Sequence, residues 1–144
     1  MKVIARNGVA LLIGVLLGSA VNMGLVILGP SLIPPPPGVD VTDMDNLKVS
    51  MHLFEPRHFV FPFLAHALGT LVGAFVTAVI AVSHRHRMAL AVGVIFLAGG
   101  ITNVIMLPGP GWFAALDLLL AYLPMAWLGS RLSSRRTAAR PAAG

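Results

Sequence analysis

Residues 8–29, GVALLIGVLLGSAVNMGLVILG, decide the fold of this 144-residue chain. The stretch has 22 residues and no charged side chain. At a helical rise of about 1.5 Å per residue it reaches about 33 Å, which is enough to cross the hydrocarbon core of a bilayer. Because backbone groups in lipid must bond within their own segment, the stretch predicts a membrane-spanning helix. Gly18-Ser19-Ala20 would suit signal cleavage, but the uncharged run continues for nine more residues, 21–29, so we expect the helix to be retained.

Three further apolar segments lie at about 59–82, 88–107 and 112–129, each bounded by proline, glycine or arginine, and Pro124 should kink the last of them. Only 10% of the chain is charged and 57% is hydrophobic, whereas a soluble domain has about 25% charged residues. Long unbroken apolar runs favour helices over the short alternating strands of a membrane barrel. The sequence therefore predicts an all-α integral membrane four-helix bundle, formed by a single domain over residues 1–132.

The charges predict the orientation of this bundle. Four of the five acids lie in the loop 30–58, whereas eight of the ten cations flank the helices on the other side. By the positive-inside rule both termini are cytoplasmic, the loop 30–58 faces outward, and the setting is an inner membrane. The net charge of +5 thus reflects topology, and we expect the bilayer, not nucleic acid, as partner. Residues 133–144 are expected to form a disordered basic cytoplasmic tail. The eight cations are Lys2, Arg6, Arg85, Arg87, Arg131, Arg135, Arg136 and Arg140.

The outer loop has a pattern of its own. Four prolines, 34–37, should hold the chain away from the first helix. Thr42 and Asp45 have the spacing of a capping box. A helical apolar stripe then predicts a short amphipathic helix that lies on the membrane surface or over the mouth of the bundle. Glu55-Pro56 would end it and start the second span. The stripe consists of Met44, Leu47, Met51 and Phe54.

Each predicted span carries one strongly polar residue at a similar depth, roughly 8–12 Å below the outer surface. A central aspartate costs about 2.5–3.5 kcal/mol to insert, so these side chains should face inward and meet. We expect them to form a ligand-binding polar layer, although the two asparagines could equally serve as interhelical hydrogen-bonding groups. The residues are Asn22, His66, Asn103 and Asp117.

A metal site is an alternative use of this region. Glu55 and His58 form a Glu-x-x-His pair, the spacing by which di-iron bundles present two ligands to one metal. With His66 and Asp117 they would make a four-residue set for a divalent metal. The chain has no cysteine, which excludes thiolate ligands and disulfides.

Two weaker patterns concern assembly. The first predicted span contains Gly18-x3-Asn22, and the third contains the same pattern as Gly99-x3-Asn103. This recurrence fits either two parallel helical-hairpin repeats or chance similarity between apolar helices. Two small-residue motifs would let helices approach closely, either inside the bundle or in a homodimer. They are formed by Gly14 with Gly18 and by Gly69 with Gly73.

No motif supports a hydrolase, kinase or dinucleotide enzyme. The leading hypothesis is a non-enzymatic membrane protein whose outward-facing polar pocket binds a cation, a proton or a small ligand, as a transport or sensing subunit. One alternative is an intramembrane metalloenzyme. Another is a structural or accessory subunit of a membrane complex with an unknown membrane partner.

Overall fold

Helices form almost all of the computed structural model, which describes residues 2–138, with side chains through Ser134. Four helical segments are long and apolar enough to cross a membrane, which is compatible with a multi-pass membrane protein and confirms the four predicted apolar helices. The segments are α1 (Lys2–Leu32), η2 with α3 (Pro56–Phe59 and Val60–Ile80), α4 (Arg85–Met106), and α5 with α6 (Gly111–Leu120 and Leu123–Ala138).

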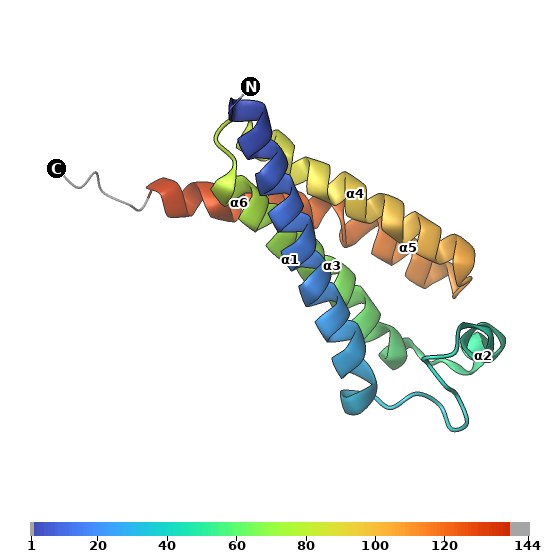
Figure 1. Ribbon diagram of the computed structural model, residues 1–144. Coiled ribbons are helices and arrows are strands. Elements are labelled where there is room, and N and C mark those ends of the chain that lie inside the picture. The colour runs from blue at the N-terminus through green and yellow to red at the C-terminus, as the bar shows by residue number, and fades with distance from the viewer. Residues whose placement is uncertain (1, 139–144) are drawn as a thin grey trace.

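The spans form two arms that diverge (Figure 1). In one arm α1 and α3 run antiparallel in contact along their length, and in the other α4 and α5 lie side by side. The arms meet near the N-terminus of α1 and spread apart toward the opposite end, where α2 (Met44–Ser50) lies. Beyond α5, α6 packs on α3 and α4 and joins the arms at their closed end.

Glycines allow the close contact between α1 and α3. A Cβ atom on Gly18 would lie 2.6 Å from the carbonyl oxygen of Gly69, and one on Gly73 would lie 2.8 Å from that of Gly14. Both distances are too short for a real Cβ, so only glycine permits the observed approach. The two small-residue motifs therefore face each other within one chain. All four glycines are buried in this contact, which corresponds to the alternative of packing inside the bundle, and the homodimer stays a prediction.

The fourth span is two helices, whereas the sequence predicted a single helix kinked at Pro124. The α-helical conformation stops at Ala121–Tyr122 and restarts at Leu123. Pro124 has no amide hydrogen, so it is tolerated in the first turn of α6 but would break a continuous helix. The second span, α3, has no such break, so the two halves differ here. The internal repeat stays a prediction.

The C-terminal part of the chain is more ordered than predicted. Helix α6 extends to Ala138, so residues 133–138 of the predicted disordered tail are helical. The rest of that tail, 139–144, lies outside the described residues.

The predicted amphipathic helix of the loop is present as α2, but its cap differs. Asp43, not Thr42, is the N-cap residue, and its carboxylate accepts bonds from the backbone N–H groups of Asp45 and Asn46. Thr42 instead donates to Asp40 through both its hydroxyl and its N–H. An aspartate satisfies the free amides of a helix start as well as a threonine does, so Asp43 can serve as the N-cap in place of Thr42.

Turns on either side of α2 follow the sequence closely. The proline run ends in a turn in which the Val39 N–H bonds the Pro36 carbonyl at 3.1 Å, and Gly38 takes a φ of 82°. That conformation disfavours side chains and explains the glycine. After a short 3-10 segment, η1 (Met51–Leu53), the second span starts with Pro56 in the first turn, as predicted.

Candidate ligand pocket

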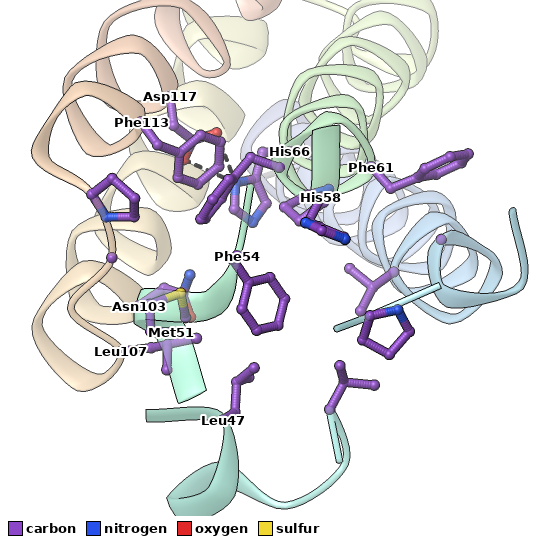
Figure 2. Close-up of a pocket in the computed structure, with 18 of the residues that line it drawn as sticks. Leu47, Met51, Phe54, His58, Phe61, His66, Asn103, Leu107, Phe113 and Asp117 are labelled. Carbon is purple, nitrogen blue, oxygen red and sulfur yellow. Dashed lines mark hydrogen bonds and ion pairs between the residues drawn. The ribbon is translucent and has the colours of Figure 1, made fainter. Parts of the chain in front are cut away.

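An ion pair joins the two arms. His66 of α3 and Asp117 of α5 meet, and His66 Nδ1 lies 2.9 Å from both carboxylate oxygens (Figure 2). The Asp117 side chain is 2% exposed and that of His66 is 17% exposed. A buried carboxylate is costly unless it is paired and hydrogen-bonded, and here it is both. The expectation that these two ionisable residues face inward and meet therefore matches their positions in the structure.

Tyr122 completes this cluster, and sequence reasoning missed it. Its hydroxyl donates to Asp117 Oδ2 at 2.9 Å, and its ring stacks on the His66 ring at 5.7 Å between centroids. The break in the fourth span lies at Tyr122 itself, five residues after Asp117, so the tyrosine bonds back onto the carboxylate. Pro124 was the only sequence feature that pointed to this contact, because a proline indicates an irregular backbone at this position. A single aromatic residue in an apolar run otherwise fits ordinary packing.

An outer cavity of about 400 Å³ opens between the arms at the α2 end (Figure 2). Its lining includes all four polar residues predicted from depth: Asn22, His66, Asn103 and Asp117. Most of the remaining lining is apolar and aromatic, and comes from α1 to α5, from η1 and η2, and from the loops between them. A mostly apolar hollow with a few convergent polar groups is typical of small-molecule sites. Whether these residues bind a ligand stays a prediction.

The apolar stripe of α2 and the segment after it covers this outer cavity. Met44, Leu47, Met51 and Phe54 all belong to its lining, so the amphipathic helix lies over the mouth. Phe54 also packs on the Phe59 ring, with 6.2 Å between centroids. Aromatic contacts then continue from Phe59 to Trp112 and Phe113 at the start of α5. These contacts connect the loop to both arms.

A second, inner cavity of about 260 Å³ lies against the His66 and Tyr122 rings. Asn22, His66 and Asn103 line both cavities, so the two share a polar boundary. Asn103 is exposed, whereas Asn22 is half-buried. Asn22 Oδ1 is buried and, among the described residues, has no hydrogen-bond partner. Buried polar atoms are usually satisfied, so this acceptor is a specific feature of the site. The rest of the inner lining is Gly69, Thr70, Phe96, Gly99, Gly100 and Tyr122.

Glycines create space for the groups around the inner cavity. A Cβ on Gly69 would lie 2.9 Å from Asn22 Cβ, so α3 must present a glycine for Asn22 to take its place. Gly100 of α4 is also buried, and a Cβ there would collide with the Tyr122 phenol. Thr70 turns its hydroxyl to the His66 carbonyl at 2.7 Å and thereby satisfies its own buried donor.

The four-residue metal set does not form. Within residues 2–138, no three His, Cys, Asp or Glu side chains lie close enough to hold a metal ion. The Glu55 carboxylate instead pairs with Arg57 at 3.0 Å. His58 Nδ1 accepts the Glu55 backbone N–H at 2.9 Å, as the partner residue of a capping box. Local bonds at this helix start thus join Glu55 to His58, and His66 and Asp117 form a separate contact between α3 and α5.

The pocket carries little net charge. Its lining contains one acid, Asp117, and two histidines, but no lysine or arginine. The other acids remain in the loop and are solvated. Among them Asp40 has a pKa below its usual value, because the Thr42 hydroxyl and N–H donate to its carboxylate. The one acid in the lining of the two cavities is therefore the one already in contact with His66.

Comparison with known proteins identifies no relative of this chain. No family model, no curated protein and no solved structure matches the chain. The functional argument therefore depends on the residues themselves.

Proposed function

We propose that this chain is a non-enzymatic inner-membrane protein that binds a small ligand in the outer and inner cavities, as a transport or sensing subunit. The observation that carries the proposal is the pair of His66 with the buried Asp117 in the lining of a cavity that is also lined by Asn22, whose buried Oδ1 has no partner among the described residues. Ionisable residues inside a span are expensive and mark functional sites by default.

The architecture also separates the pocket from the basic end of the chain. Asn7 Nδ2 bonds Ser83 Oγ at 2.9 Å, which holds the start of α1, with Lys2 and Arg6 nearby in sequence, at the α3–α4 turn. His86 Nδ1 lies 2.8 Å from Ser130 Oγ, so α6 reaches the same end. The α2 end is opposite (Figure 1). Under the positive-inside rule the basic end is cytoplasmic, and the pocket faces outward.

A thermal-shift panel on the full chain in lipid nanodiscs tests ligand binding. The probes are a pH series, Na⁺, K⁺, Ca²⁺, Zn²⁺ and short amphiphiles with neutral, anionic and cationic headgroups. A compound that binds the folded state raises Tm in proportion to its saturation. We expect at least one probe to raise Tm of the wild type and to lose this effect in Asp117→Asn and His66→Ala.

The control for the panel is Thr102→Val, at an exposed residue of α4 that lines neither cavity and bonds only its own helix. It should respond like the wild type. The proposal is wrong if no probe raises Tm of the wild type, or if the pocket variants show the same rise in Tm as the wild type. The polar cluster would then serve only to hold the helices together.

A further inference from the structure

We propose that the ligand is a neutral amphiphile, with a hydroxyl-type headgroup in the inner cavity against Asn22 and an apolar chain in the outer cavity beneath α2. This inference rests on the proposed function and specifies the chemistry of its ligand. It distinguishes an amphiphile from the cations and protons that the same pocket could take.

The headgroup is inferred from Asn22. Its Oδ1 is buried and lacks a donor among the described residues, so a donor that enters the inner cavity gains a bond when the Asn22 side chain turns toward it. Asn103, on the same two cavities, carries an amide that can donate. A hydroxyl both donates and accepts, so a single group can satisfy Asn22 Oδ1 and take a bond from Asn103. His66 uses Nδ1 for Asp117, which leaves Nε2 for a further polar atom of the ligand.

The neutrality of the ligand follows from the partners of Asp117. The carboxylate already accepts from His66 and from the Tyr122 hydroxyl, so a cationic headgroup would have to compete with both. An anionic headgroup finds no lysine or arginine in the lining of either cavity. Desolvating an unpaired charge is far more expensive than desolvating a hydroxyl. The site therefore selects against both signs of charge.

The chain of the amphiphile is inferred from the outer cavity. Its walls come from aliphatic and aromatic side chains of every surrounding element, and the stripe of α2 forms its cover. Figure 2 shows Leu47, Met51 and Phe54 on the side of the cavity opposite Asp117 and His66. The His66–Asp117 pair thus lies at one end of the cavity and the apolar stripe of α2 at the other. This polarity matches a molecule with a head and a tail, and does not match a bare ion.

A matched ligand series tests the inference. Nanodiscs containing the full chain are titrated with 1-decanol, decane, decanoate and decylammonium, which share a tail and differ in headgroup, and with glycerol as a headgroup without a tail. Binding is followed as the shift in Tm. We expect 1-decanol to bind at least about tenfold more tightly than the other four, the size of about one neutral hydrogen bond.

Two variants assign the effect to the site. Asn22→Leu should weaken 1-decanol binding about tenfold while leaving decane unaffected, because only the headgroup contact is lost. Thr102→Val should bind 1-decanol like the wild type. If Asn22→Leu does not fold, a photoreactive diazirine analogue of 1-decanol on the wild type replaces it. Crosslinks should then fall on the α2 stripe and α5, and competition by unlabelled 1-decanol should remove them.

The outcomes separate this inference from the proposed function. If Na⁺, K⁺ or Ca²⁺ shifts Tm through Asp117 and 1-decanol does not, the pocket binds a ligand but the amphiphile is wrong. Tighter binding of decylammonium or decanoate overturns the neutrality argument, and equal binding of decane and 1-decanol overturns the headgroup argument. If no probe binds, both proposals fail.

Discussion

His66 Nδ1 lies 2.9 Å from both carboxylate oxygens of Asp117, although the two residues are 51 positions apart in the sequence. The pair connects α3 of one arm to α5 of the other. Few other interactions join α3 to α5, whereas α3 has an extensive contact with α6. The ion pair therefore has two consequences: it stabilises the position of α5, and it fixes the polar boundary of the pocket.

Removing both members of this pair should destabilise the protein by less than the two single removals added together. Asp117→Leu or His66→Leu leaves a buried polar partner uncompensated, which costs about 3–5 kcal/mol of unfolding free energy. The double variant loses both and should be less destabilised than the sum of the single variants. Unfolding by SDS in mixed micelles, analysed as a double-mutant cycle, measures this coupling. Additive single effects would contradict the contact.

Tyr122→Phe provides a milder change at the same carboxylate. It keeps the ring that stacks on His66 and removes only the hydroxyl that donates to Asp117. Loss of one hydrogen bond to a charged group should cost about 1.5–3 kcal/mol. The same unfolding assay reports it, and a cost as large as that of Asp117→Leu would mean that Tyr122, not His66, is the main partner.

Glycine substitutions should distinguish the packed face of α1 from its exposed face. Gly18→Ala puts a Cβ 2.6 Å from the Gly69 carbonyl, so α1 and α3 must separate, at a cost of about 1–3 kcal/mol. Gly24→Ala, six residues further on the same helix, meets nothing within 4 Å and should be neutral or slightly stabilising. The midpoint of SDS unfolding compares the two. Equal effects would indicate that the glycine contact contributes nothing.

Much of the architecture could be predicted because it depends on local properties. Three features can be read from a few neighbouring residues, and each is present in the structure. They are the four apolar segments, the apolar stripe of α2 and the helix start at Pro56. The polar residues could be placed together because lipid penalises their exposure, which is a depth argument that needs no tertiary information.

The remaining features depend on which helix packs on which. Tyr122 joins Asp117 only because the fourth span breaks at that residue, and Pro124 alone predicted a kink. The glycine motifs could serve one chain or two until α1 was found on α3. Glu55 and His58 had the spacing of metal ligands, but neighbouring groups bind both side chains instead. The two residues form a capping box with each other, and Arg57 pairs with the Glu55 carboxylate.

The cap of α2 gives a test of the loop. Asp43→Ala removes the side chain that accepts from the N–H groups of Asp45 and Asn46, which should cost about 1 kcal/mol of local helix stability. Thr42→Ala is the matched control, because Thr42 bonds Asp40 outside the helix. Hydrogen–deuterium exchange over Met44–Ser50 should accelerate about fivefold in Asp43→Ala only. Faster exchange in Thr42→Ala alone would restore the capping box that the sequence first predicted.

Single cysteines determine which side of the membrane the pocket faces. The chain has no cysteine, so each variant carries one reactive thiol. Val49→Cys lies on α2, where the native side chain is 75% exposed, and Ser134→Cys lies at an exposed position of α6. If both termini are cytoplasmic, as the positive-inside rule predicts, a membrane-impermeant maleimide should label Val49→Cys in intact spheroplasts, and Ser134→Cys only after permeabilisation. The opposite pattern would place the pocket mouth in the cytoplasm, and the positive-inside assignment would be wrong for this chain. The ligand pocket itself would remain, but it would then draw its ligand from the inner leaflet or the cytoplasm.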